Sequence, residues 1–300
     1  IDKIIEELHK HDVTCIVDEA HGAHFTLGSP FPESAIECGA DIVVHSAHKM
    51  LPAMTMGSYL HITSFRVSER KVKEYLTMLQ SSSPSYPIMA SLDYARSYIG
   101  TFTQEERDQN LKEINKFVQA LEAVHPQLIV KRTDDPLKLV MRLEGRSGYA
   151  LQQLLESEGI YPELADPDYV LLILPLLKKD RSFPYNEAIG RVCKALGNEP
   201  IIEKRTDHEP NRSNSQEFFT TLTLSFEEME EKVEALIAID EAEGKISAGM
   251  VTPYPPGIPL LIPGERITSH AIERLTEYVK NKANIQGHHR LDENRVFVYR

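Results

Sequence analysis

Apolar residues near the start of the chain change from helical to strand-like spacing. They recur at helical intervals over residues 1–10, whereas residues 13–17 (VTCIV) are a wholly apolar, β-rich run. Such an uninterrupted run is typical of a strand buried on both faces of a parallel sheet. Residues 42–44 and 57–62 predict two further strands, and residues 34–38 a short helix. We therefore predict α/β structure with parallel pairing at the start of the chain.

The following residues have helical periodicity and then become mixed. Three helices are predicted at 68–79, 85–100 and 103–124, and the last begins with the capping box Thr103-x-x-Glu106. A smaller α+β unit is predicted after them, from strands at 128–130, 137–143 and 169–174 and helices at 147–158 and 185–196.

A polar, turn-rich stretch at 197–219 precedes the last part of the chain. Ser225-x-x-Glu228 predicts a helix whose inward-facing positions are Met229, Val233, Leu236 and Ile237. Residues 251–264 contain five prolines and two glycines around apolar residues, and predict a stiff, buried connection; a helix at 269–281 and a strand at 295–299 follow. The predicted domains are 1–101, part of a large domain; 102–200, a small α+β domain; 201–219, a linker; and 220–300, a C-terminal domain.

The composition argues against several classes of protein, such as nucleic-acid-binding and membrane-spanning proteins. The 300 residues are 41% hydrophobic and 26% charged, and the net charge of −12 opposes binding to nucleic acid. We expect no membrane span, because no apolar run approaches about 20 residues. Cys15, Cys38 and Cys193 are far apart and form no C-x-x-C, which favours a reducing, cytoplasmic location. Because Ile1 already lies inside a helical pattern, we expect a longer native polypeptide.

Residues 17–24 (VDEAHGAH) contain the letters of a helicase acidic box. That interpretation requires the phosphate loop G-x-x-x-x-G-K-[ST], and the only Gly-Lys pair, Gly244-Lys245, is followed by isoleucine. A metal site is a second interpretation, but the sequence has no H-E-x-x-H pair to support it. Its candidate ligands are Asp18, Glu19, His21, His24, His45 and His48.

A third interpretation accounts for more residues. Asp18 ends one predicted strand, and Lys49 follows the next strand 31 positions later. In open α/β sheets ligands bind at the carboxyl ends of strands. Lysine forms a Schiff base with pyridoxal phosphate (PLP), and an aspartate can keep the pyridine nitrogen of that cofactor protonated. Taken alone, Lys49 is better interpreted as a solvated charge after a strand.

Four segments together resemble the bacterial ornithine/lysine/arginine decarboxylases. They are residues 17–62, 81–96 (SSSPSYPIMASLDYAR), 159–176 (GIYPELADPDYVLLILPL) and 251–267 (VTPYPPGIPLLIPGERI), in family order. The resemblance implies a PLP enzyme of the aspartate-aminotransferase fold (fold type I) in its short form. Such an enzyme has a large domain with a mainly parallel sheet and smaller α+β C-terminal domains. The family's upstream glycine-rich phosphate loop and its ring-stacking side chain are absent from these residues.

Residue by residue, the resemblance assigns roles around the cofactor. Lys49 resembles the Schiff-base lysine and Asp18 the partner of the pyridine nitrogen, while Ala20 would pack on the ring and His21 would lie beside it. The resemblance also implies a cytoplasmic enzyme of polyamine biosynthesis, active as a homodimer or higher homo-oligomer with shared active sites.

The remaining assignments concern the phosphate and the substrate. Ser46 and His48 resemble phosphate neighbours. Ser82 resembles a phosphate contact from a second subunit, although the adjacent Ser81 or Ser83 could occupy that position instead. Glu163 is the candidate partner for a basic substrate side chain, and His48 or Lys49 the proton donor. The sequence leaves arginine, lysine and ornithine open as substrates. Transamination, a lyase reaction and a non-catalytic role in regulation or assembly are the alternatives.

Overall fold

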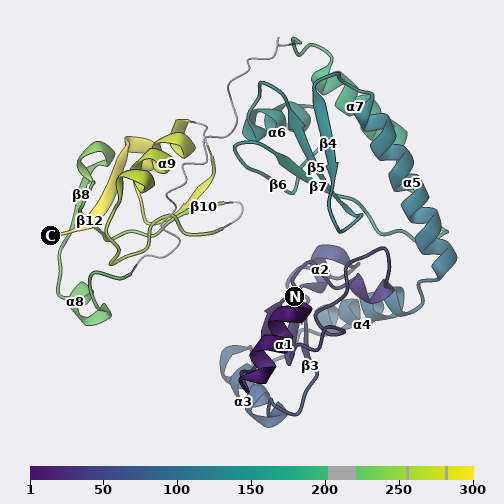
Figure 1. Ribbon diagram of the computed structural model, residues 1–300, viewed down its shortest axis with the longest axis horizontal. Coiled ribbons are helices and arrows are strands. Elements are labelled where there is room, and N and C mark those ends of the chain that lie inside the picture. Colours follow the sequence, from purple (N-terminus) through teal and green to yellow (C-terminus); the bar gives the residue numbers. More distant parts are fainter. Residues whose placement is uncertain (202–220, 255–256, 281–282) are drawn as a thin grey trace. The chain divides into compact units, whose positions relative to one another are not determined.

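The computed structural model describes residues 1–201, 221–254, 257–280 and 283–300 (Figure 1). The predicted linker, except for Ile201, lies outside the described residues. The chain forms two compact units. The first consists of Ile1–Leu121, Lys131–Leu139 and Ile173–Ile189, and the second of Glu122–Val130, Val140–Leu172 and Gly190–Arg300. The four-part division drawn from the sequence stays a prediction. In the described part of the chain, no helix is long and apolar enough to cross a membrane.

The first sheet has the order β1-β2-β3, with β1 at Ile16–Asp18, β2 at Ile42–His45 and β3 at Tyr59–Ile62. Strands β1 and β2 are parallel, as predicted, whereas β3 runs antiparallel to β2. The parallel prediction was wrong for β3. Between β2 and β3 the chain forms a single four-residue helix, α2 (Ala47–Met50), and so makes no long helical crossover of the kind that parallel strands require.

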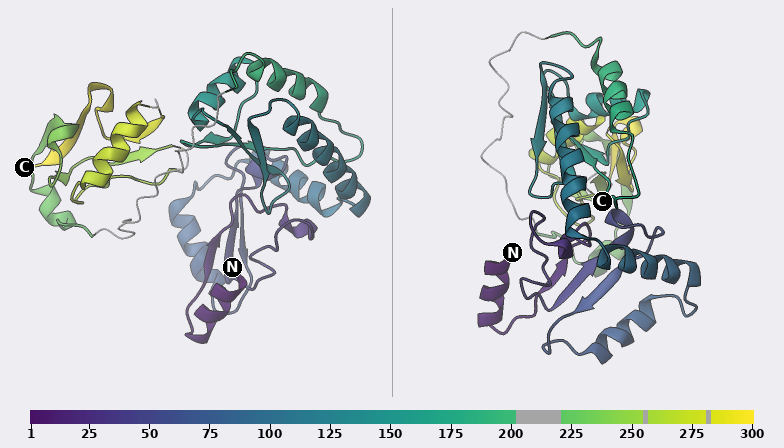
Figure 2. Two further views of the ribbon diagram at one scale, coloured as in Figure 1. Left: turned by 45° about the horizontal axis from the view of Figure 1, so that its top comes forward. Right: turned by 90° about the vertical axis from the view of Figure 1, so that its right-hand side faces the viewer.

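Burial differs sharply between the two parallel strands. In the central strand β2 Val43 is fully buried, but in β1, at the edge of the sheet, Ile16 is 66% exposed. Burial on both faces was therefore correct for β2 and wrong for β1. Helix α1 (Asp2–Lys10) covers one side of the sheet through Ile5, and α3 (Glu69–Leu79) lies on the other side (Figures 1 and 2).

Residues 35–39 form turns, so the helix predicted at 34–38 was wrong. The reason is a tertiary contact at the start of the segment. The Ser34 hydroxyl and the Ala35 amide both donate to the Glu19 carboxylate, at 2.9 Å each, which ties the segment to the end of β1.

The three long helices predicted next are confirmed, as α3, α4 (Tyr86–Gly100) and α5 (Gln104–Glu122). The capping box forms before α5: the Thr103 amide donates to Glu106 Oε2 at 2.8 Å, and the Glu106 amide donates to Thr103 Oγ1 at 3.2 Å. Helix α5 buries Ile114, Phe117, Val118 and Leu121. Helix α3, in contrast, has no fully buried residue among those described.

The second sheet has the order β4-β5-β7-β6. Its strands are β4 (Leu128–Arg132), β5 (Lys138–Leu143), β6 (Leu164–Ala165) and β7 (Val170–Ile173), and helices α6 (Gly148–Ser157) and α7 (Tyr185–Leu196) belong to the same region. Strand β5 alternates between partly buried and buried residues, as a strand with one face on a core does. The predicted strands and helices are confirmed here, except that the two-residue strand β6 was not foreseen.

The C-terminal part contains three strands in the order β8-β12-β9, a separate β10-β11 pair, and helices α8 and α9. Their bounds are α8 Phe226–Glu230, β8 Glu234–Ala238, β9 Ile246–Ser247, β10 Val251–Pro253, α9 Ser269–Lys280, β11 Ile285–Gly287 and β12 Arg295–Tyr299. Leu261, Ile267, Leu275, Leu291 and Val296 contribute to one apolar core. The final helix and strand were predicted correctly.

Two predictions made from the sequence are corrected in the C-terminal part. The Ser225–Glu228 capping box forms, but α8 ends at Glu230, so the predicted helix through Ile237 was wrong. Pairing with β12, which sets Ile237 opposite Val296, takes these residues into β8. In the proline-rich segment Leu261 is buried, whereas Ile258 is 70% exposed, so only part of that segment is a buried connection.

Candidate active site

Asp18 and Lys49 lie at the carboxyl ends of two neighbouring parallel strands. Asp18 is the last residue of β1, paired in register with Val44 of β2. Lys49 lies in α2, which begins two residues after β2 ends. Both side chains are exposed. Because parallel strands end at the same edge of a sheet, the carboxylate and the amine are presented at one edge.

The loops that follow β1 and β2 are joined by a hydrogen bond. The Ser46 amide donates to the Ala20 carbonyl at 3.1 Å, and the Lys49 amide donates to the Ser46 carbonyl at 3.0 Å. Six of the predicted site residues therefore lie at this edge, at the end of β1, in the residues that follow each strand, or in α2: Asp18, Ala20, His21, Ser46, His48 and Lys49.

His48 is oriented by the turn before β3. Its Nδ1 lies 2.9 Å from the Gly57 carbonyl, and its backbone amide also donates to that oxygen at 3.2 Å. A carbonyl oxygen only accepts hydrogen bonds, so Nδ1 carries a proton. In the neutral ring Nε2 is therefore the acceptor, and Nε2 donates only when the ring is an imidazolium.

His21 is held in its neutral form. Burial lowers the pKa of its imidazole to about 4, and the positive charges of Lys138 and Lys49 act in the same direction. Its Nδ1 is buried and has no hydrogen-bond partner. An uncharged imidazole with an unpaired ring nitrogen thus lies close to the two lysines.

A buried cluster that includes residues of the β4–β5 turn supports the loop after β1, which carries His21. His24 is fully buried, and its Nε2 lies 3.1 Å from Asp135 Oδ1. Asp135 also pairs with Lys138 at 3.0 Å and accepts from the Leu137 amide at 3.1 Å. Burial raises the pKa of Asp135, but these partners outweigh it and hold the pKa below its usual range. Asp135 and Lys138 were not predicted from the sequence, because nothing in the local pattern around Asp135 indicates that its partner His24 lies 111 residues away.

Glu19 is the second acidic residue of the VDEAHGAH stretch, and it is fully engaged with protein donors. Its Oε2 accepts from His45 Nε2 at 2.7 Å, in addition to its bonds from Ser34 and Ala35. Burial raises its pKa, and the three hydrogen bonds together lower it below the ordinary value. Within the ranges that the structure describes, no group of three or more His, Cys, Asp or Glu residues is arranged to hold a metal ion.

The two remaining predicted residues lie elsewhere. Ser82 is exposed in the connection between α3 and α4. Glu163 is exposed directly before β6, in the second unit, and its amide donates to the Leu171 carbonyl at 2.8 Å. Their roles stay predictions.

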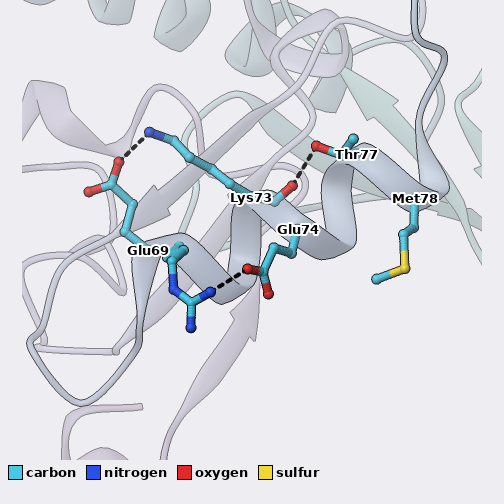
Figure 3. A pocket seen from close by; sticks show the side chains of 6 residues that line it. Glu69, Lys73, Glu74, Thr77 and Met78 are labelled. Atoms are coloured by element: carbon cyan, nitrogen blue, oxygen red, sulfur yellow. Dashed lines mark hydrogen bonds and ion pairs between the residues drawn. The ribbon is translucent and has the colours of Figure 1, made fainter.

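A shallow surface pocket on α3 contains none of these residues (Figure 3). Its charged side chains pair with one another, Lys73 with Glu69 and Arg70 with Glu74, each at 2.6 Å. Exposed pairs of this kind, one turn apart on a helix, are typical of a solvated helix face. The pocket therefore offers no group for the chemistry described above.

Comparison with known proteins identifies relatives along most of the chain. The protein-family model of the Orn/Lys/Arg decarboxylase major domain matches residues 1–135. The family model of the Orn/Lys/Arg decarboxylase C-terminal domain matches residues 211–289. The uncharacterized protein YaaO of Bacillus subtilis is 42% identical over 99% of this chain and 62% of its own length. An arginine decarboxylase of Bacillus subtilis is 29% identical over 95% of this chain and 59% of its own length.

The solved structure of the constitutive lysine decarboxylase of E. coli superposes with a TM-score of 0.72 at 16% identity, covering 98% of this chain and 56% of that one. That likeness confirms the predicted PLP-enzyme fold, with a large domain and smaller C-terminal parts. The chain spans about 60% of the length of the curated relatives it matches. The two family models together cover more than two thirds of the chain, in the order of the family's domains. On these matches the chain belongs to the Orn/Lys/Arg decarboxylase family.

Proposed function

We propose that this protein decarboxylates a basic amino acid with pyridoxal phosphate attached to Lys49. The observation that carries the proposal is the placement of Asp18 and Lys49 at the carboxyl ends of adjacent parallel strands. The similarity to an arginine decarboxylase of Bacillus subtilis supports the reaction class.

The residues at this edge fit such a cofactor by their chemistry. PLP needs an amine for its aldehyde, a carboxylate for its ring nitrogen and an uncharged surface beside its ring. Lys49 and Asp18 are exposed and supply the first two groups. The neutral His21 imidazole, with its unpartnered Nδ1, is suited to lie beside an aromatic ring.

The residues of this chain would hold and orient the reactants and move protons. PLP, when bound, supplies an electron sink for the bond that breaks. Asp18 would keep the ring nitrogen protonated through its negative charge. Lys49 Nζ would hold the cofactor, and as a free ammonium it would donate a proton to the substrate carbon. His48 is the alternative donor, and it can donate from Nε2 only as an imidazolium, because Nδ1 is bonded to Gly57.

The substrate and assembly are further parts of the proposal. Glu163 is the proposed partner for the distal ammonium or guanidinium of arginine, lysine or ornithine. Ser82 is the proposed phosphate contact from a second subunit, which would make the active form a cytoplasmic homodimer or higher oligomer. Amine formation of this kind belongs to polyamine biosynthesis.

The test is incubation of the purified protein with PLP and, separately, arginine, lysine and ornithine, with CO₂ and keto acid both measured. We expect CO₂ from one of the three and a borohydride-trapped label at Lys49. Lys49→Ala should lose the label and the turnover, whereas Lys71→Ala, on the exposed face of α3, should keep both. Keto acid without CO₂ would identify a transaminase, and no label in the wild-type protein would favour a non-catalytic role.

A further inference from the structure

A carboxylate–imidazole pair joins the carboxyl ends of β1 and β2, beside the proposed site residues Asp18 and Lys49. Glu19 directly follows Asp18, and its amide continues the β1–β2 ladder by donating to the Val44 carbonyl at 3.0 Å. His45 is the last residue of β2. Their side chains meet at 2.7 Å, with only 12% of Glu19 and 3% of His45 exposed. Successive side chains of a strand point to opposite faces, so Glu19 is directed away from the face that Asp18 occupies.

We infer that Glu19 and His45 are positioning residues, which set the separation and orientation of Asp18 and Lys49 from the opposite face of the sheet. The inference rests on the proposed function for its catalytic meaning. Its geometric part, that the pair holds the two loops together, concerns this chain alone.

The fixed position of the Glu19 carboxylate supports this role. It accepts from His45, Ser34 and Ala35, so neither oxygen is free to rotate toward solvent. On its far side the His45 ring packs edge-on against His61, with the ring centroids 4.8 Å apart. Hydrogen bonds to an ionised acceptor are about twice as strong as those between neutral groups. Relative movement of the ends of β1 and β2 would break the bond between Glu19 and His45.

Gly22 shows how closely the loop is fitted around the pair. A Cβ atom at Gly22 would lie 2.3 Å from Glu19 Cγ and 2.6 Å from Cδ. The Gly22 amide also donates to the Glu19 carbonyl at 2.8 Å. An added Cβ atom at position 22 would therefore force the Glu19 side chain to move. Gly22→Ala should displace Glu19 without removing any of its hydrogen-bonding groups.

The chain offers a matched control at the other end of β2. His9 Nε2 lies 2.9 Å from Oδ2 of Asp41, the residue before β2, so the same pair of groups is present at the amino end of the strand. His9→Gln should reduce stability without affecting the loops that carry Asp18 and Lys49.

The experiment compares Glu19→Gln, His45→Gln and Gly22→Ala with His9→Gln in two measurements. Without cofactor, hydrogen exchange reports the Ser46 amide, which bonds to the Ala20 carbonyl, relative to the amides within β2. We expect the Ser46 amide to exchange its hydrogen at least about tenfold faster in the three variants than in wild type. The reason is that the bond from this amide to the Ala20 carbonyl should open first when the Glu19–His45 pair is lost. With PLP, we expect about ten- to a hundredfold weaker binding, the range found at metal sites when residues that orient the metal ligands are replaced. We also expect an altered pH titration of the absorption band of the lysine-bound cofactor.

Two results would overturn the inference. In one, Ser46 exchange in the three variants matches that of wild type. In the other, His9→Gln changes both measurements as much as Glu19→Gln does, which would make the pair a general stabiliser. If the wild-type protein fails to bind PLP at Lys49, the proposed function fails, and the exchange measurement still decides whether the pair positions the loops.

Discussion

His24 Nε2 and Asp135 Oδ1 form a 3.1 Å hydrogen bond between residues 111 positions apart. His24 lies in the loop after β1, and Asp135 in the turn between β4 and β5. Neither side chain exposes more than 6% of its surface. The contact fixes the loop that carries His21 against a distant turn, so the shape of the candidate active site depends on a part of the chain that contributes none of its predicted residues.

Replacing Asp135 should destabilise the protein strongly. Asp135→Ala leaves His24 Nε2 buried without its partner and removes the partner of Lys138. Breaking a buried pair by removing one member costs about 3 to 5 kcal/mol. We expect a loss of that size in the free energy of unfolding from denaturant titration. The neighbouring Asp134 is exposed, so Asp134→Ala is the control and should change stability by less than about 0.5 kcal/mol. Equal effects of the two substitutions would contradict this account.

His21 should make stability depend on pH between about 6.5 and 4. Its folded-state pKa is lowered to about 4 from the ordinary 6.5, so within this window the unfolded chain binds the proton and the folded chain does not. Stability contributed by neutral His21 is therefore present above pH 6.5 and is lost as the pH falls toward 4. In His21→Gln and His21→Asn, denaturation midpoints should fall less steeply across this window than in wild type. Slopes equal to that of wild type would show that His21 titrates normally.

Two glycines should respond in opposite directions to alanine. At Gly148 an added Cβ would lie 2.2 Å from the carbonyl oxygens of both Asp166 and Tyr169, which are backbone atoms that cannot rotate away. Overpacking of this kind costs about 1 to 3 kcal/mol. Gly190 lies inside α7, and an added Cβ meets nothing within 4 Å, so Gly190→Ala should stabilise by about 1 kcal/mol through helix propensity. Thermal unfolding checks both signs, and stabilisation by Gly148→Ala would refute the close approach of the α6 start to residues 166–169.

Asp18→Asn tests the proposed partner of the cofactor nitrogen without changing side-chain shape. A hydrogen bond to a charged group contributes about 1.5 to 3 kcal/mol, so PLP affinity should fall about ten- to a hundredfold. Asp12→Asn is the control: Asp12 precedes β1 at its opposite end and pairs with Arg66. Titration of the absorption band with PLP measures both affinities. An unchanged affinity in Asp18→Asn would remove Asp18 from the cofactor site.

Much of the architecture could be predicted because its signals are local. The Thr103–Glu106 capping box marks the start of α5, and the apolar run at 42–44 marks β2, because caps and core-facing stripes depend on residues a few positions apart. Asp18 and Lys49 were predicted in the same way, because Asp18 ends one strand, Lys49 follows the next, and ligands of an α/β sheet bind at those ends. The other candidate site residues were predicted from the family resemblance.

The wrong predictions concern segments whose structure depends on partners far away in the sequence. The sequence predicted a helix with Leu236 and Ile237 on its inward face, but antiparallel pairing with β12 takes these two residues into β8. It predicted burial for β1, whose edge position leaves Ile16 exposed. A short run of residues does not by itself specify which strand will pair with it, or whether the pair is parallel or antiparallel. The packing of the whole unit determines both.

By itself the sequence determined the family and the caps and core stripes of most helices, and it predicted two candidate reactive side chains at strand ends. The tertiary structure alone decided how those side chains are supported, through the pairs of Glu19 with His45 and His24 with Asp135. The physical reason is that a cap or an apolar stripe is satisfied by near neighbours in the chain. A buried carboxylate instead requires donors from separate elements, and folding alone brings those donors together.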